Sequence, residues 1–369
     1  MRLGNEISIA FLLIAMVTFT VVAQTPTEQD PGTARTTRVQ STVLTESKTN
    51  STEANNNGNQ TARAYPAESS ERKSAIHETA SSYLSAASAS LDRGRCNDAI
   101  ASLELASQVA PNSTAVHFEL GYAYSCVKQY ENSIKAYERA VSLDPLSVVI
   151  RRSLAIVYIN SGKARQAIGH LQEALRLEPD KAINHYLLAV AYNDADELDD
   201  AAAQYWNSLV RNPNHYLSYF GLAKIYMDQA RTKDAIELLK KAIQLKPDFE
   251  DGHVALAHAF DSTGNYKDAI RNYDSAIKLN PKNVVAQNNL GVAWLSIGKN
   301  KEGLAAIKSA AALAPDIGQI HLNLARAYLQ MQNKDAALAE YSFLKKIDPT
   351  LAQTVYDDIF RRRILRVRN

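Results

Sequence analysis

Large apolar residues recur with a period of 34 residues along residues 80–351. If units are counted from Ala80, position 7 is leucine and position 11 is aromatic in every unit except the first. These two positions lie one turn apart on an α-helix, so each unit is predicted to hold a helix with one buried face. The leucines are Leu120, Leu154, Leu188, Leu222, Leu256, Leu290 and Leu324, and the aromatics are Tyr124, Tyr158, Tyr192, Tyr226, Phe260, Trp294 and Tyr328.

Proline marks the same period. Eight of the eleven prolines lie 34 residues apart, from Pro111 to Pro349, at position 32 of each unit. Chance does not place eight prolines on one lattice, so this region is a repeat array. Each of these prolines is predicted to end a second helix, and a residue that follows it to cap the next first helix. The candidate caps are Asn112, Asp180, Asn214, Asp248 and Asp316.

Small residues fill two further positions. Position 8 is always Ala or Gly, and position 20 is always Ala, Ser or Gly, which lets two helix backbones approach closely. Position 15 is glycine in four units, where a helix C-terminus needs left-handed backbone angles. These glycines are Gly94, Gly162, Gly264 and Gly298.

This pattern of small, large and proline positions resembles the tetratricopeptide repeat. The resemblance implies an all-α fold, a right-handed superhelix or α–α solenoid built from antiparallel helix pairs, with the first helix of each pair on the concave side. The array is expected to occupy residues 74–351 and to contain eight repeats. Their expected bounds are 80–113, 114–147, 148–181, 182–215, 216–249, 250–283, 284–317 and 318–351.

Two segments flank the array. Residues 1–23 include an uncharged apolar run from Ile7 to Ala23, typical of a signal peptide cleaved after Ala23. The alternative is an uncleaved membrane anchor at residues 7–23, although this run is shorter than the roughly 20 residues that span a bilayer comfortably. Residues 24–73 are rich in Ser, Thr, Asn and Gln and are expected to be a disordered linker. The protein is therefore expected to be exported, either periplasmic or secreted.

The C-terminal residues 352–369 are predicted to form a basic capping helix over the last repeat. An apolar face is supplied by Val355, Tyr356, Ile359, Phe360, Ile364 and Leu365. Five arginines in the last nine residues form either a solvated helix end or a site for an acidic lipid or polymer. These are Arg361, Arg362, Arg363, Arg366 and Arg368.

Charge and motifs exclude several functions. The formal net charge is +2, and without the five C-terminal arginines it would be −3, so no nucleic-acid partner is expected. No phosphate loop, HExxH pair or GxSxG motif occurs, so we expect no cofactor and no enzymatic activity. Histidine stands at position 4 of alternate units, but neighbours would lie on the order of 20 Å apart, too far to share a metal. Packing is the expected role of His117, His185, His253 and His321.

The chain has two cysteines, Cys96 and Cys126. In the implied stack, the start of one second helix lies beside the end of the next first helix, so a disulfide can form. The alternative is two independent small core residues. Both interpretations stay open from the sequence alone.

The resemblance implies that positions 2, 5, 6, 9, 12 and 13 of the first helices face a groove. In units two to five the residues at positions 5 and 9 are mostly apolar or aromatic, a composition that suits a bound peptide. These residues are Phe118, Tyr122, Arg152, Ile156, Tyr186, Val190, Phe220 and Lys224. The alternative is burial between neighbouring helices. In units seven and eight, Asn289 and Asn323 at position 6 resemble the asparagine ladder with which O-linked N-acetylglucosamine transferases hold a peptide backbone.

The sequence thus predicts a non-enzymatic scaffold that binds a peptide or protein of unknown identity, most simply in a bacterial cell envelope. The alternative function is binding of a cell-wall glycan or an anionic surface, with aromatics stacked on sugars and the C-terminal arginines in peripheral contact with the envelope.

Overall fold

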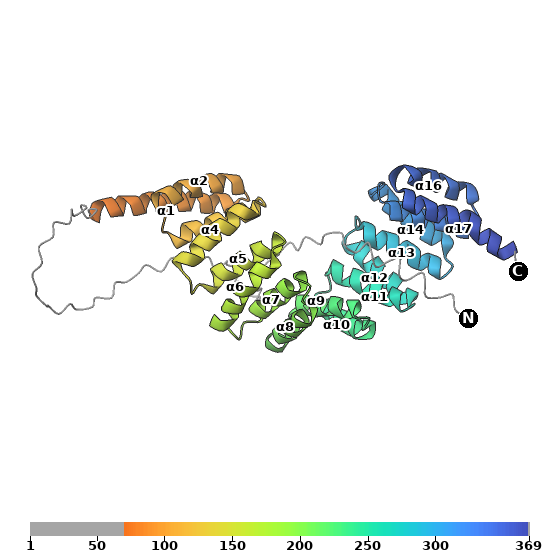
Figure 1. The fold of residues 1–369 in the computed structure, drawn as a ribbon, viewed down its shortest axis with the longest axis horizontal. Coiled ribbons are helices and arrows are strands. Elements are labelled where there is room, and N and C mark those ends of the chain that lie inside the picture. The colour runs from red at the N-terminus through yellow and green to blue at the C-terminus, as the bar shows by residue number, and fades with distance from the viewer. Residues whose placement is uncertain (1–69, 368–369) are drawn as a thin grey trace, which may run out of the picture. The chain divides into compact units, whose positions relative to one another are not determined.

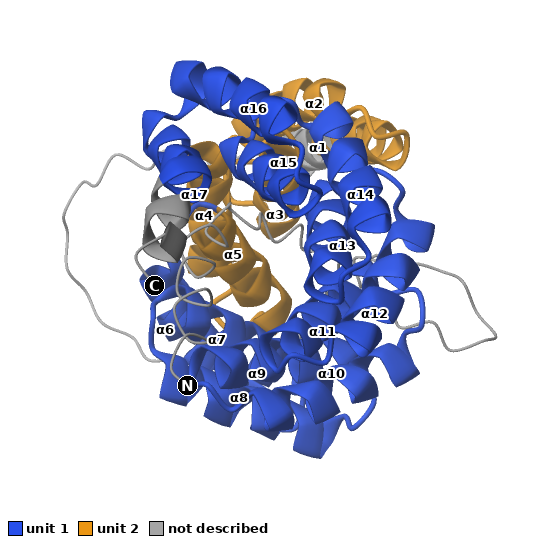
Figure 2. Cartoon of the chain, turned by 90° about the vertical axis from the view of Figure 1, so that its right-hand side faces the viewer, with its two compact units in different colours: residues 1–18, 161–369 blue, residues 19–160 orange. Residues whose placement is uncertain are grey.

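The computed structural model describes the backbone of residues 70–367 and the side chains of residues 78–360. Every regular element in this range is an α-helix, so the expected all-α solenoid is confirmed. The chain divides into two compact units, which Figure 2 colours separately. Of the described residues, 70–160 belong to the N-terminal unit and 161–367 to the C-terminal unit.

The helices follow the repeat positions along the chain (Figure 1). In the N-terminal unit they are α1 (Ser70–Asp92), α2 (Cys96–Val109), α3 (Thr114–Cys126), α4 (Tyr130–Leu143) and α5 (Val148–Asn160). In the C-terminal unit they are α6 (Ala164–Leu177), α7 (Ala182–Asp194), α8 (Leu198–Arg211), α9 (Tyr216–Asp228), α10 (Thr232–Leu245), α11 (Glu250–Ser262), α12 (Tyr266–Leu279), α13 (Val284–Ser296), α14 (Asn300–Leu313), α15 (Gly318–Gln330), α16 (Lys334–Ile347) and α17 (Pro349–Val367).

The helix ends agree with those predicted from the repeat prolines, but the predicted capping residues need one correction. Every second helix ends at position 30, two residues before the repeat proline. The predicted caps at position 33 are wrong: the capping residue is at position 34, because the turn after the proline takes one more residue. Ser113 and Asn283, for example, accept the backbone N–H of Val116 and Ala286. The five residues predicted as caps, Asn112, Asp180, Asn214, Asp248 and Asp316, each lie one residue too early.

The turn between the two helices of a repeat always uses a left-handed residue at position 15. Gly94, Gly162, Gly264 and Gly298 have φ between 71° and 79°, as predicted. The other four repeats place non-glycine residues there, at φ between 59° and 65°, which costs free energy because of their Cβ atoms. These residues are Lys128, Asp196, Ala230 and Gln332.

Small residues bring the paired helices together. The residues at positions 8 and 20 are buried in all eight repeats. Helices α13 and α14 approach so closely that a Cβ added to Gly303 would lie 2.8 Å from the carbonyl oxygen of Gly291. In the N-terminal unit, Ser133 at position 20 donates a hydrogen bond of 2.6 Å to the carbonyl of Gly121.

Both ends of the array differ from the expected bounds. Helix α1 begins at Ser70, inside the segment expected to be linker, and ten residues before Ala80. Helix α17 begins at Pro349 rather than at residue 352, because the Asp348 carboxylate accepts the N–H groups of Thr350 and Leu351.

Helix α17 covers the last repeat, as the capping helix was expected to do. Its Val355 and Ile359 are buried against Leu322 of α15 and Leu344 of α16. The predicted signal peptide, most of the linker and the side chains of the five C-terminal arginines lie outside the described residues. Among the helices of the described part, none is long and apolar enough to cross a membrane.

Candidate binding surface

Within the C-terminal unit the first helices form an inner wall. First helices of neighbouring repeats contact each other, α9 with α11, α11 with α13 and α13 with α15, whereas no two second helices of the described chain come into comparable contact. Figure 2 shows the same arrangement, with α7, α9, α11, α13 and α15 on the inner side of the curve. In the N-terminal unit, α3 and α5 contact each other in the same way. We call the exposed face of these first helices the inner wall.

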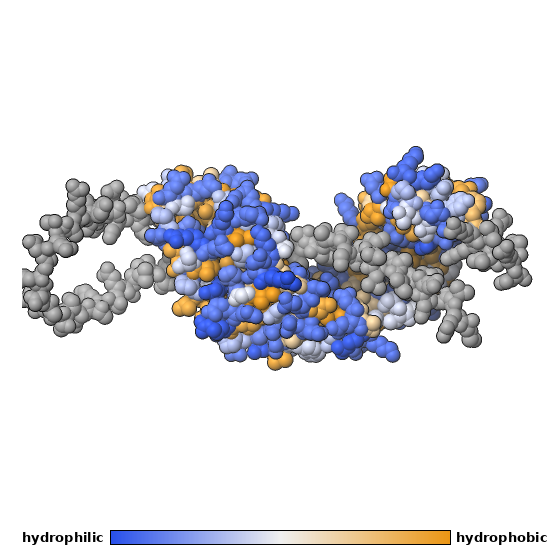
Figure 3. Space-filling view, in the orientation of Figure 1, coloured by the Kyte–Doolittle hydropathy of each residue, from blue (hydrophilic) through white to orange (hydrophobic). Residues whose placement is uncertain are grey.

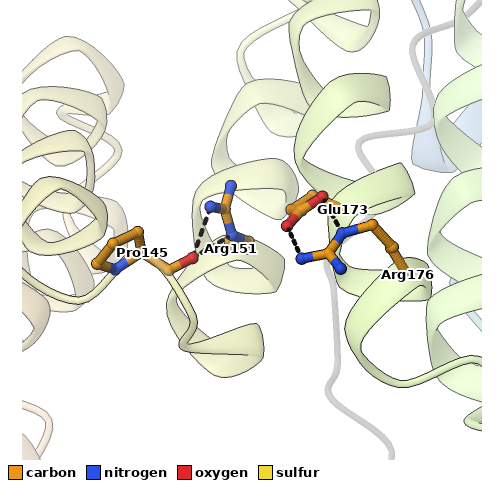
Figure 4. A network of polar contacts seen from close by, with 4 residues as sticks. All are labelled: Pro145, Arg151, Glu173 and Arg176. Atoms are coloured by element: carbon orange, nitrogen blue, oxygen red, sulfur yellow. Dashed lines mark hydrogen bonds and ion pairs between the residues drawn. The ribbon is translucent and has the colours of Figure 1, made fainter.

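The histidines at position 4 form hydrogen bonds to the turns between repeats rather than a ligand site. His117, His185, His253 and His321 each donate from Nε2 to the carbonyl of the proline six residues earlier, at 2.8–3.2 Å. Arg151 donates to Pro145 in the same manner (Figure 4), and Gln287 to Pro281. This position therefore supplies a hydrogen-bond donor for a carbonyl that the helix cannot satisfy. No group of three or more possible metal ligands exists among the described residues.

Position 24 also alternates between repeats. Tyr137, Tyr205 and Tyr273 are buried in the repeats that carry histidine at position 4, and Tyr341 is half-buried in the last of them. The repeats between them have Leu103, Leu171, Leu239 and Ile307 there, all fully buried.

The aromatic residue at position 11 joins each repeat to the one before it. The hydroxyls of Tyr124 and Tyr158 donate to Glu104 and Glu138, twenty residues earlier, both at 2.6 Å. Where a lysine stands at the earlier position, its ammonium group lies over the ring instead, as in Lys240 over Phe260 and Lys308 over Tyr328. These aromatics are therefore part of the framework and are not candidates for binding a partner.

The inner wall of the N-terminal unit presents large apolar side chains beside the charged Arg152. Tyr122 is 51% exposed and Val149 is 41% exposed, which is high for large apolar side chains. Phe118 is half-buried and packs edge-on against Tyr137, with ring centroids 5.7 Å apart. Arg152 and Ile156 are also half-buried. The predicted residues of repeats two and three therefore lie on one accessible face of α3 and α5.

The predicted aromatics of the C-terminal unit are less exposed than Tyr122. Tyr186 packs beside Tyr205 and His215, with ring centroids 6.1 and 4.7 Å away, and burial raises its pKa to about 12. Phe220 packs edge-on against Phe249 at 5.0 Å. Val190 is buried between the helices, so it does not line an accessible surface, contrary to the prediction.

Carboxylates accompany these aromatics and were not predicted from the sequence. Burial raises the pKa of Asp228, Asp251 and Asp261, and that of Asp261 reaches about 6. The positive charge of the exposed Lys224 partly offsets the rise for Asp228 and Asp251. For Asp261, burial is the cause of the rise. Aspartate at positions 2, 12 and 13 of first helices was the feature that could have revealed them.

The predicted asparagine ladder is wrong for Asn323. Its side chain is 3% exposed, and its amide donates to Asn288 at 2.9 Å across the boundary between α13 and α15. The amide of Asn288 in turn donates to Asn289 at 3.0 Å. Asn323 thus holds two repeats together, while the half-buried Asn289 keeps its place on the inner wall.

Cys96 and Cys126 form a disulfide in the structure, with their Cα atoms 6.3 Å apart. The bond joins the first residue of α2 to the last residue of α3, and so links repeat one to repeat two. Cys96 is buried and Cys126 is exposed.

The face drawn in Figure 3 carries no continuous apolar patch, because its apolar side chains form separate spots among polar ones. Trp206 and Val210, one turn apart on α8, are 48% and 73% exposed. Trp206 nevertheless has a framework role, because its indole N–H lies 3.2 Å from the hydroxyl of Tyr226.

Several solved structures share this fold. Pseudomonas aeruginosa PilF is 18% identical, with a TM-score of 0.52 over 58% of this chain and 98% of that chain. A chain of the APC/C hetero-tetramer Cut9–Hcn1 is 17% identical, with a TM-score of 0.54 over 79% and 59%. Human IFIT1, solved as a dimer with PPP-AAAA, is 19% identical, with a TM-score of 0.51 over 80% and 77%. At these identities the likeness shows the fold alone.

The curated proteins include no match to this chain. Family models of the tetratricopeptide repeat match residues 114–147, 152–212, 194–248, 226–271, 254–316 and 295–352. Together these matches cover the array almost continuously, from the second repeat to the start of α17. The chain therefore belongs to the tetratricopeptide repeat family.

Proposed function

We propose that this protein is a non-enzymatic scaffold that binds a peptide or protein segment along the inner walls of its repeats. The observation that carries the proposal is that two sets of aromatic side chains have different surroundings. The aromatics at position 11 contact the preceding repeat, whereas on the inner wall Tyr122 is 51% exposed and Phe220 is only half-buried. Accessible aromatics on a rigid helical wall are the side chains that dominate binding energy in protein interfaces.

The charge of the inner wall favours a protein over a nucleic acid. Asp194, Asp228, Asp251 and Asp261 all stand on first helices of the C-terminal unit. Nucleic-acid binding depends on cationic surfaces that neutralise phosphates, and carboxylates oppose it. The hydrogen bonds of the position-4 histidines support a scaffold without catalysis, because these rings are engaged in the turns.

We further propose that the protein is exported, with residues 1–23 removed and the array in a cell envelope. The disulfide between Cys96 and Cys126 supports this location, because disulfides persist in oxidising compartments and are rare in the cytosol. The mass of the mature protein tests it: a chain that begins at Gln24 is expected. A protein that retains Met1 in the purified envelope fraction contradicts it.

A photocrosslinking experiment tests the binding surface. Benzoylphenylalanine replaces Tyr122 or Phe220 on the inner wall, or Trp206 on the outer helix α8 as the matched control, in the native host. We expect ultraviolet light to join the same partner to the two inner positions and not to position 206. Adducts only at position 206, or none at either inner position, would contradict the proposal.

A further inference from the structure

The disulfide between Cys96 and Cys126 is open to solvent on one side. Cys96 is buried, whereas Cys126 is exposed at the end of α3. Cys126 occupies position 13 of its repeat, and this position is Asp, Asn, Ser or Gln in each of the other seven repeats. The bond therefore lies at a surface position, and a dissolved thiol meets the Cys126 side of the bond before the Cys96 side.

An open depression leads to the bond. It has a volume of about 360 Å³ and is lined by residues 94–98 at the start of α2, together with Cys126 and Val127 at the end of α3. Thiol–disulfide exchange needs a thiolate to reach one sulfur of the bond, and its rate depends on that access. The depression is large enough for a small thiol or for the side chain of a cysteine presented by another protein.

The start of α2 suits Cys96 as the leaving sulfur. Cys96 is the first residue of α2, and the side chain of the preceding Arg95 does not cap the helix. The N–H groups and the dipole at the start of a helix stabilise a thiolate. Asp98 in the same turn is paired with Arg95 at 3.6 Å, so its negative charge is offset. A stabilised thiolate leaves faster in thiol–disulfide exchange.

The framework contacts between repeats one and two are complete without the bond. Leu103 of α2 is buried with Leu120 and Ala123 of α3. The Tyr124 hydroxyl also donates to Glu104 at 2.6 Å. The later repeats join in the same manner without a covalent link, because the chain has only two cysteines. An exposed bond that the packing does not require has the character of the labile and regulatory disulfides.

We propose that the Cys96–Cys126 bond is a thiol–disulfide exchange site, which a protein dithiol opens and a disulfide re-forms, and that its redox state controls how firmly repeat one is attached to the array. In the reduced chain the start of α2 loses its link to the end of α3, while the contacts of Leu103 and Tyr124 remain. The site is separate from the peptide-binding surface of the proposed function, and neither requires the other.

The exchange balances with a dithiol as the reductant. One thiolate of the dithiol attacks the Cys126 sulfur, the bond to Cys96 breaks, and the electron pair leaves with Cys96 as a thiolate that takes a proton from the solvent. The second thiolate of the dithiol attacks the sulfur of the first in the mixed disulfide and releases Cys126 as a thiolate, which is protonated in turn. The chain gains two electrons and two protons, and the dithiol becomes a disulfide.

Reduction of the full chain by dithiothreitol tests the access to the bond. We expect the rate constant in the folded chain to lie within about 10-fold of that in concentrated urea, where the bond is fully exposed. A disulfide sealed in the fold is reduced only after unfolding, which slows the reaction by a factor on the order of 1,000 or more. Slowing beyond about 10-fold would therefore overturn the proposal.

Glutathione identifies the sulfur that is attacked. After a brief reaction and alkylation of the free thiols with N-ethylmaleimide, peptide mass spectrometry should find glutathione on Cys126 and maleimide on Cys96. Glutathione mainly on Cys96, or equally on both, would contradict the assigned direction of attack.

A pair of arginine variants tests the leaving sulfur. Arg95→Gln leaves Asp98 unpaired beside Cys96, so we expect reduction by dithiothreitol to slow several-fold. The matched control is Arg93→Gln, which changes an exposed residue of the same turn outside the depression and should keep the natural rate. Equal rates in the two variants would remove Arg95 from the mechanism.

Hydrogen exchange of the full chain, with and without dithiothreitol, tests the consequence of reduction. We expect exchange to accelerate several-fold in α1 and α2 and to stay unchanged in α4 and α5, with the helical circular dichroism preserved. Oxidised glutathione should reverse the change. The variant Cys96→Ser/Cys126→Ser, which lacks the bond in every condition, should not respond to dithiothreitol. Unchanged exchange in α1 and α2, or a loss of the helical signal on reduction, would overturn the control of repeat one by the bond.

Discussion

The inner walls of the two units use the same helix positions but carry different chemistry. In the N-terminal unit, the large apolar side chains of Tyr122 and Val149 are exposed on the wall. In the C-terminal unit, Tyr186 and Phe220 are less exposed than Tyr122, and the first helices carry Lys224 and Asp261, whose pKa is raised by burial. The framework positions, by contrast, repeat with little change in both. A repeat array can therefore alter what its wall binds, one repeat at a time, without altering the packing that forms the wall.

The disulfide is the largest framework difference between the two units. Replacement of Cys96 and Cys126 by serine opens a 30-residue loop, and we expect the N-terminal unit to lose about 3–4 kcal/mol of unfolding free energy. Hydrogen exchange should accelerate in α1–α3 and remain unchanged in α11–α16. Equal acceleration in both units would show that the two are not independently stabilised.

The close approach of α13 and α14 provides the next test of the framework. Gly303→Ala places a Cβ 2.8 Å from the Gly291 carbonyl, and we expect a loss of about 1–3 kcal/mol in urea unfolding. Gly169→Ala in α6 is the matched control, because its Cβ would meet no atom within 4 Å. That change should stabilise the helix by up to about 1 kcal/mol. Similar losses in both variants would contradict the packing argument.

The left-handed turn residues predict effects of opposite sign. Ala230→Gly, at φ 59°, should raise the free energy of unfolding by about 0.5–1 kcal/mol, because glycine adopts this conformation without strain. Gly264→Ala, at φ 76°, should lower it by about 1 kcal/mol. Urea denaturation of the pair measures both, and changes of the same sign would contradict the assignment.

The smallest expected effect comes from the wall of the C-terminal unit and depends on pH. Because folding raises the pKa of Asp261 from 3.8 to about 6, the folded state binds the proton more tightly. The stability associated with this group is present below about pH 4 and is lost as the pH rises through about 6. Asp261→Asn should therefore raise the unfolding temperature at pH 8 and change it little at pH 4. Asp199→Asn, on α8, is the control and should show no such difference.

The helix bounds could be predicted from the sequence because each repeat contains residues that end a helix or allow close helix packing. Proline at position 32 and the small residues at positions 8 and 20 leave only one arrangement of two close helices. The predicted caps failed by one residue because the length of the turn after proline is set by its backbone geometry. No residue pattern at Asn112 or Asp180 revealed that length.

The binding surface was less predictable, because a residue's place at position 5 or 9 of a repeat does not determine whether its side chain is exposed. Val190 is buried at the same position at which Tyr122 is exposed, since helix packing differs from repeat to repeat. Asn323 looked like a ligand residue but is used by its neighbour Asn288. The raised pKa of Asp261 could not be predicted, because it is caused by burial, which depends on how neighbouring helices pack.

The alternation of histidine at position 4 and tyrosine at position 24 makes the pair of repeats, rather than the single repeat, the natural module for engineering. Repeats with His–Tyr always adjoin repeats with leucine or isoleucine at position 24. Removal of two consecutive repeats, 68 residues, brings together faces that already meet elsewhere in the chain. Removal of one repeat sets two of the same kind against each other, an interface for which this sequence contains no precedent.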